Sequence, residues 1–191
     1  MKTYISSNHP AFFSLLRDAR QTYQEIAERK NAAKNWVVRL WLKYQPKRVF
    51  LNIYSKNAWG GAESRSGSGS SLEQTKTIRE QLPIIIRNLG VKSFLDIPCG
   101  DFYWMKQVRL ELEEYIGADI IAQLIEHNRA LYTGENRRFT VLDIMKDQLP
   151  PVDLIFSRDC LVHFSFRDIR RTIRNIKRSH SKYLLTTTFT A

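Results

Sequence analysis

From residue 72 onward, short apolar runs alternate with longer amphipathic segments. The apolar runs predict five strands, at residues 92–97, 115–120, 137–144, 152–159 and 182–189. The amphipathic segments predict helices, at residues 72–90, 102–114, 121–132 and 167–180. This alternation predicts an α/β fold with a doubly wound, mostly parallel sheet that carries helices on both faces. In the first helix we expect Ser71 as the N-cap, Gly90 as the stop and a kink or break at Pro83.

The N-terminal third has a different pattern. Residues 10–45 carry apolar side chains at spacings of three and four, which predicts a basic helical extension over residues 1–58. Pro46 is expected to end any helix there. The Gly/Ser-rich stretch 59–71, "WGGAESRSGSGSS", is either a flexible linker or a loop that closes over a ligand with its backbone amides and Arg65. The α/β domain would then span residues 72–191.

The net charge of +11 is concentrated in residues 1–60, which hold 11 Lys/Arg against 3 Asp/Glu. An excess of this kind suits anionic partners, although a solvated basic helix face is the favoured interpretation. The two cysteines, Cys99 and Cys160, form no CxxC pair, so neither a disulfide framework nor a zinc site is indicated, and no metal is expected. No apolar run is long enough to span a bilayer and the start lacks a signal-peptide pattern, so a cytoplasmic protein is expected.

An acid lies at the carboxyl end of four of the predicted strands: Asp96, Asp119, Asp143 and Asp159. Any one of them could be a turn former or helix cap, but a set delivered to the carboxyl edge of a sheet indicates a ligand site. Asp119 lies 23 residues after Asp96, where a carboxylate can accept hydrogen bonds from both ribose hydroxyls. Asp143 is placed to accept from an adenine amino group.

The turn "FLDIPCGD", residues 94–101, has one glycine, Gly100, which lets a ligand approach the backbone closely. The phosphate-binding pattern G-x-G-x-x-G is absent, since Pro98 and Phe102 stand where further glycines would be. Asp96 and Asp101 would repel a pyrophosphate and attract a cation. This chemistry favours S-adenosylmethionine, with its sulfonium and ammonium, over a nicotinamide dinucleotide.

Taken together, "FLDIPCGD", "YIGADI", "FTVLDI" and "LPPVDLIFSRDCLVHF" resemble, in order, the motifs of the class I S-adenosylmethionine-dependent methyltransferases. The resemblance covers about residues 72–188 and implies the Rossmann-like fold of that family. It implies that Asp96 and Gly100 flank the methionine part of the cofactor, Asp119 holds the ribose, Asp143 and Ile144 frame the adenine, and Arg158 and Asp159 line the methyl-transfer cleft. The stretch 59–71 resembles that of a bacterial subfamily in which it would cap the cofactor. The full set of cofactor-binding residues expected is Trp59, Arg65, Asp96, Pro98, Cys99, Gly100, Asp101, Asp119, Ile120, Asp143, Ile144 and Arg158.

The sequence departs from the family in two respects. Pro98 and Phe102 replace the usual first and third glycines of the turn. The family normally adds two further strands after the fifth, and these are missing here, so we expect an exposed fifth strand through which the chain could associate with itself.

Two residues are candidates for the base that takes a proton from the methyl acceptor, Asp159 and His163. His163 could instead bond backbone at a helix start, and Asp159 could be a cap or the ion-pair partner of Arg158. Cys160 is expected to be a packed thiol. The sequence favours methyl transfer to the oxygen or nitrogen of a small acceptor that is anionic or derived from a sugar. A non-catalytic adaptor and a nucleic-acid-associated methyltransferase remain alternatives, the latter disfavoured because the stacked-aromatic strand motifs of RNA modules are absent.

Overall fold

The computed structural model describes residues 46–58, 60 and 62–187. The chain divides into two compact units, Met1–Gly60 and Gly61–Ala191. The described element of the first unit is helix α3, Pro46–Ser55. The helix that Pro46 was predicted to end lies before it, outside the described residues. The helical stripe predicted within residues 10–45 lies outside the described residues.

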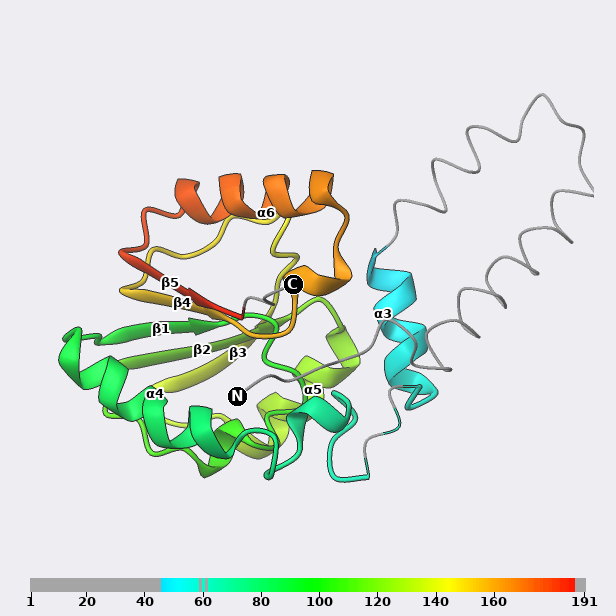
Figure 1. Ribbon diagram of the computed structural model, residues 1–191, viewed down its shortest axis with the longest axis horizontal. Helices are drawn as coiled ribbons and strands as arrows, with labels where there is room; N and C mark the ends of the chain where they lie inside the picture. The colour runs from blue at the N-terminus through cyan, green and yellow to red at the C-terminus, as the bar shows by residue number, and fades with distance from the viewer. Residues whose placement is uncertain (1–45, 59, 61, 188–191) are drawn as a thin grey trace, which may run out of the picture. The chain divides into compact units, whose positions relative to one another are not determined.

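The second unit is built on a five-stranded sheet. Its strands are β1 Ser93–Asp96, β2 Glu114–Asp119, β3 Arg137–Val141, β4 Leu154–Ser157 and β5 Tyr183–Thr186. Their order is β3-β2-β1-β4-β5, and all four pairings are parallel (Figure 1), which confirms the predicted doubly wound α/β fold. The strand order reverses between β1 and β4, and ligands of such sheets bind beyond the carboxyl ends of the strands at this point.

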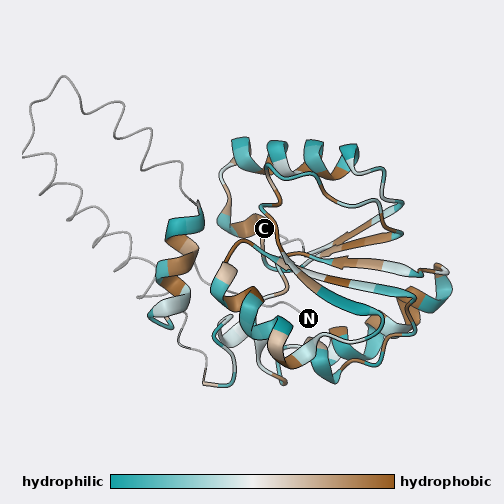
Figure 2. Cartoon of the chain, turned by 180° about the vertical axis from the view of Figure 1, so that it is seen from behind, coloured by the Kyte–Doolittle hydropathy of each residue, from teal (hydrophilic) through white to brown (hydrophobic). Residues whose placement is uncertain are grey.

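Helices cover the two faces of the sheet. Helices α4, Lys76–Asn88, and α5, Ala122–Tyr132, pack on one face, and α6, Phe166–Arg178, packs on the other (Figure 1). Two apolar clusters fill the space between the layers. The cluster on the α4 and α5 side includes Leu82, Ile86 and Ile125, and that on the α6 side includes Ile176. The helices therefore expose their polar sides, which Figure 2 shows as teal on α6. No helix in the described part of the chain is long and apolar enough to cross a membrane.

The helix predicted at residues 102–114 is wrong. The chain there forms only the short 3-10 helix η3, Met105–Gln107, and then runs irregularly into β2. Val108, Leu110 and Leu112 alternate with polar residues and pack against the apolar cluster on the α4 and α5 side. An alternation of period two places the apolar side chains on one side of an extended chain, whereas a helix would spread them around its axis.

The start of α4 also differs from the prediction. The helix begins at Lys76, and the Ser71 hydroxyl instead accepts the Gln74 N–H at 3.3 Å, which closes a turn before the helix. The helix continues through Pro83 without a break. Gly90 adopts φ +62° directly after the helix, as expected for the stop.

The outer side of β5 pairs with no other strand in the part of the chain that the structure describes. Tyr183 and Leu184 of this strand are exposed. Self-association through this edge stays a prediction.

Candidate functional site

Four carboxyl groups lie at the carboxyl edge of the sheet. Asp96 and Asp119 are the last residues of β1 and β2, and Asp143 and Asp159 follow β3 and β4 by two residues. Parallel strands end at the same edge, so the fold delivers all four acids to one side of the molecule. This edge of the sheet is therefore rich in acids, although the chain as a whole carries a net charge of +11.

Asp96 is buried, with 3% of its surface exposed, and its Oδ2 accepts a hydrogen bond from the Tyr115 hydroxyl at 2.5 Å. Burial raises the pKa of Asp96 to about 7; the Tyr115 hydrogen bond opposes this rise and the Asp119 carboxylate adds to it. A cationic ligand beside this carboxyl group would favour its ionised form and so oppose the rise in its pKa.

Asp119 ties the turn after β1 to the end of β2. Its Oδ2 accepts the Gly100 N–H at 3.3 Å, and its Oδ1 accepts the Ile121 N–H at 3.0 Å. Burial raises the pKa of Asp119 to about 6, against the hydrogen bonds from the backbone of Ile121, Gly100 and Ile120. An ionised carboxylate offers about four acceptor positions, so Asp119 can accept from a ligand while it holds the turn.

The turn at residues 97–101 has a compact backbone. The Ile97–Pro98 peptide bond is cis, and Gly100 adopts φ +56°. A Cβ on Gly100 would lie 2.3 Å from the Ser66 hydroxyl oxygen, so any other residue would displace Ser66 and strain the backbone at this positive φ. The Cys99 N–H donates to the Ala118 carbonyl at 2.8 Å, and burial raises the pKa of its thiol. Cys99 is thus a packed residue that contributes backbone to the site rather than a reactive thiol.

The Gly/Ser-rich stretch folds back on this turn through Asp101. The Asp101 carboxylate accepts hydrogen bonds from the Ser64 hydroxyl at 2.9 Å and from the Arg65 N–H at 2.8 Å. The Ser66 hydroxyl accepts the Asp101 N–H at 3.1 Å. Ser64 is only 3% exposed, whereas a solvated linker would leave it in water. These contacts, which include the Arg65 backbone, argue against a flexible linker over residues 64–66. Closure of the loop over a ligand stays a prediction, and Trp59 lies outside the described residues.

Asp143 and Ile144 form a turn after β3. The Asp143 Oδ1 accepts the Met145 N–H at 2.9 Å, and Lys146 lies 3.4 Å from the other carboxylate oxygen. Ile144 is buried in the apolar cluster on the α6 side, and its carbonyl accepts a hydrogen bond from Asn175 of α6. The turn is therefore anchored to the core on one side and acidic on the other.

Arg158 and Asp159 connect the end of β4 to the Gly/Ser-rich loop. The Arg158 guanidinium donates to the Gly69 carbonyl at 2.9 Å and pairs with Asp159 at 3.0 Å, which confirms the predicted ion pair. Asp159 adopts φ +50°, and its N–H donates to the Thr187 hydroxyl at 2.9 Å. Aspartate is one of the few residues other than glycine that adopt this left-handed conformation with some frequency.

His163 ends the short 3-10 helix η4, Leu161–His163, a few residues beyond Asp159. Its side chain is exposed, yet partial desolvation lowers its pKa below the usual value, and the Asp159 carboxylate opposes this shift. A neutral imidazole at pH 7 can accept a proton. Cys160 is a buried free thiol whose pKa burial raises to about 12, in agreement with the packed role predicted for it.

Three residues of the site were missed in the sequence. Tyr115 lies two positions before Gly117, the register partner of Asp96, so its place beside that acid follows from parallel pairing. Asn128 donates from its amide to the Gly100 carbonyl at 2.8 Å, and the signal for it is a polar residue at a buried position of α5. No comparable pattern pointed to Ser66, because its role depends on a loop that folds back over 35 residues.

Comparison with known proteins bears on the same region. Residues 95–182 match the family model described as "Methyltransferase domain". A search of the curated proteins found no match to the chain.

Several solved structures share the fold. Phosphoethanolamine N-methyltransferase 1 of Haemonchus contortus, in complex with phosphoethanolamine and S-adenosylhomocysteine, has a TM-score of 0.54 at 18% identity over 71% of this chain and 30% of that one. The methyltransferase domain of bacterial CtHen1-C has a TM-score of 0.52 at 10% identity over 61% of this chain and 65% of that one. PH0226 of Pyrococcus horikoshii OT3 has a TM-score of 0.48 at 21% identity over 63% of this chain, which spans 61% of PH0226. At identities this low, the TM-scores of 0.54 and 0.52 show a shared fold and nothing more.

Proposed function

We propose that the protein is a class I, S-adenosylmethionine-dependent methyltransferase, which binds S-adenosylmethionine and transfers its methyl group to a small acceptor. The match of residues 95–182 to the family model described as "Methyltransferase domain" and the parallel five-stranded sheet support this proposal. The acceptor atom in this proposal is an oxygen or nitrogen of a molecule that is anionic or derived from a sugar. S-adenosylmethionine supplies, when bound, an electrophilic methyl group on a positively charged sulfur.

One observation carries the proposal: Asp96 and Asp119 are both buried at the carboxyl ends of the neighbouring strands β1 and β2, and β1 borders the point where the strand order reverses. Burying two carboxyl groups is unfavourable, and it raises the pKa of both to about 7 and about 6. A ligand that carries ammonium and sulfonium charges and two ribose hydroxyls would stabilise both carboxylates, through opposite charge and through hydrogen bonds. A pyrophosphate would add negative charge to the same place.

The remaining assignments follow the positions of the side chains. Asp119 accepts from the ribose hydroxyls with the acceptor positions that Gly100 and Ile121 leave open. Asp96 and the backbone of Gly100 contact the methionine part. The adenine lies by Asp143 and Ile144, and Ile120 contributes backbone next to Asp119. Loop residues 62–71, held by Asp101, close this site from the outside.

The base that assists methyl transfer is His163 in this proposal. Asp159 is already engaged in an ion pair with Arg158 at 3.0 Å, which leaves His163 as the candidate base. His163 has a lowered pKa, so its imidazole is neutral near pH 7 and can take a proton from an acceptor hydroxyl or amine. Asp159 then orients Arg158, whose guanidinium has further N–H donors for an anionic acceptor.

Calorimetry with S-adenosylhomocysteine, the demethylated product, tests the proposal. We expect Asp119→Asn to weaken binding by about ten- to a hundredfold, because hydrogen bonds to a charged group contribute about 1.5–3 kcal/mol. Glu114→Gln is the matched control, since it neutralises an acid at the opposite end of the same strand, where Glu114 pairs with Arg138 at the surface. Equal affinities for both variants, or no heat with the wild-type chain, would contradict the proposal.

A further inference from the structure

Helix α6 carries an unusual concentration of positive charge. Six of its 13 residues are basic and one, Asp168, is acidic. We call the six the α6 basic face: Arg167, Arg170, Arg171, Arg174, Lys177 and Arg178. The charge excess noted in the sequence lay in residues 1–60, so this surface is a second and separate one.

The basic residues gather on the outward side of the helix. At about 100° per residue they fall within a sector of about 120° whose centre is near Arg174. Thr172 and Ile176, on the opposite side, are buried. Arg170, Arg174 and Arg178 are exposed and succeed one another at steps of four residues, about one helical turn. The result is a continuous cationic ridge along the whole helix.

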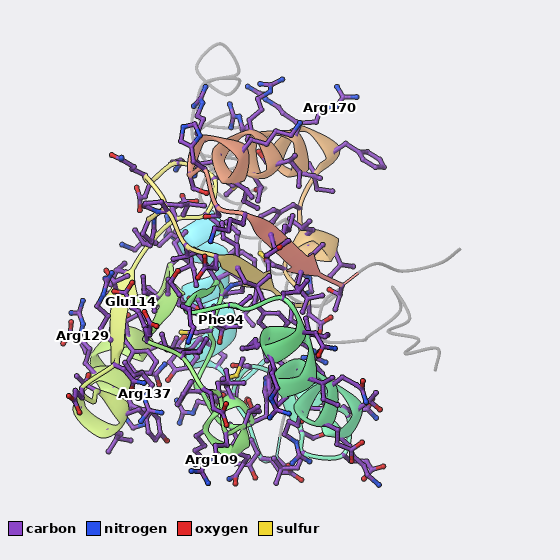
Figure 3. The ribbon with its side chains drawn as sticks, turned by 90° about the vertical axis from the view of Figure 1, so that its left-hand side faces the viewer. Phe94, Arg109, Glu114, Arg129, Arg137 and Arg170 are labelled. Carbon is purple, nitrogen blue, oxygen red and sulfur yellow. The ribbon has the colours of Figure 1, made fainter. Side chains whose placement is uncertain are left out.

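The ridge faces away from the rest of the unit. α6 is the helix that covers its face of the sheet, and no other α-helix among the described residues of the second unit lies beside it (Figure 1). Figure 3 shows Arg170 pointing outward on one side of the molecule and Arg109 on the opposite side. Within the second unit, this surface is therefore convex and is not covered by another helix.

An exposed aromatic side chain stands at the start of the ridge. Phe166, the first residue of α6, is 86% exposed, the highest value among the exposed large apolar side chains of the described residues. Val162 in η4 is 50% exposed. Exposed apolar groups beside a basic helix face suit the boundary between lipid headgroups and acyl chains, where the ring leaves water and the cations stay at the phosphates.

A polynucleotide fits the same charge less well. Proteins that bind single strands combine a basic groove with several aromatic stacking platforms, whereas this surface is a ridge with one aromatic ring. The uncharged polar residues of α6 that could contact bases, Thr172 and Asn175, are buried. A planar anionic surface, in contrast, can contact every turn of a straight convex helix at once.

We propose that the α6 basic face binds the surface of anionic lipid bilayers, with Phe166 inserted between the headgroups. The contact is electrostatic along the helix and apolar at its N-terminal end. It concerns residues outside the cofactor site, so it stands or falls independently of the proposed methyl transfer.

Flotation of the full chain with vesicles tests the inference at physiological ionic strength. We expect binding to vesicles of phosphatidylcholine with phosphatidylglycerol and none to phosphatidylcholine alone. The triple variant Arg170→Gln, Arg174→Gln, Arg178→Gln is expected to bind about a hundredfold more weakly, since the loss of each basic residue near the surface weakens binding about fivefold. The control Lys76→Gln, Arg87→Gln, Arg109→Gln removes the same charge from exposed positions elsewhere and should bind like the wild type.

Phe166→Ser removes the inserted ring without changing charge and is expected to weaken vesicle binding about tenfold. Equal weakening by the triple variant and its control would show that net charge, not this face, is responsible, and would overturn the inference. Absence of binding to the anionic vesicles would do the same. So would a single-stranded oligonucleotide that binds the α6 basic face more tightly than the vesicles do, because the partner would then be a nucleic acid. Unchanged binding of Phe166→Ser would contradict the insertion.

Discussion

The two ends of the same sheet use aspartate in opposite ways. At the amino edge, Asp153 accepts the Lys92 and Ser93 N–H groups at 2.9 Å and pairs with Lys182 at 2.5 Å, so its pKa is held well below its usual range. At the carboxyl edge, burial raises the pKa of Asp96 to about 7. The first acid is fully compensated by the chain and fastens strands together. The second acid, Asp96, lacks enough hydrogen bonds and opposite charges to offset its burial, as is typical of residues in ligand-binding sites.

The largest expected effect comes from Asp96→Asn. Because the folded-state pKa of Asp96 lies above its unfolded value of 3.8, its contribution to stability is fully present below about pH 4 and is lost as pH rises through about 7. Asparagine cannot ionise and can still accept from Tyr115, so the variant should be more stable than the wild type by about 2–4 kcal/mol near pH 8. Urea unfolding near pH 4 and pH 8 measures this difference. An Asp96→Asn variant that is less stable than the wild type at the higher pH would contradict this contrast between the two edges of the sheet.

Asp153→Ala should have the opposite effect, a loss of about 2 kcal/mol in the free energy of unfolding, because several hydrogen bonds to a charged group disappear. The depressed pKa of Asp153 means that its stabilisation is present above about pH 4 and lost as pH falls below that value. Binding of S-adenosylhomocysteine should be unchanged. Glu111→Ala, at an exposed position, serves as the control and should stay within about 0.5 kcal/mol of the wild type. Impaired ligand binding in Asp153→Ala would show that the two edges are not separate in function.

The smallest effect concerns the loop at the carboxyl edge. Ser66→Ala removes the acceptor of the Asp101 N–H, and we expect the loop to open more readily by about 1 kcal/mol. Hydrogen exchange of the Arg65 amide, which donates to Asp101, should then be about fivefold faster. Ser68→Ala, at an exposed position of the same loop, should exchange like the wild type. Identical exchange in both variants would mean that Ser66 does not hold the loop.

Much of the fold could be predicted because strand and helix patterns differ in period. The five strands, their parallel pairing and the acids at their ends follow from apolar runs that each end in a polar residue. The prediction of a helix over residues 102–114 was wrong because Val108, Leu110 and Leu112 were assigned to a helix although they are spaced two residues apart. The site could be predicted only in part: strand ends are visible in a sequence, but the contacts of Asp101 with Ser64 and Ser66 join segments 35 or more residues apart.

The measurement that tests the central claim most directly is a calorimetric comparison of S-adenosylmethionine with NAD on the wild-type chain. The acids at the carboxyl edge should favour the cationic ligand and repel the pyrophosphate, so we expect a dissociation constant of about micromolar order for S-adenosylmethionine and binding of NAD at least about a hundredfold weaker. Binding of NAD as tight as that of S-adenosylmethionine, or no binding of S-adenosylmethionine at all, would contradict the account.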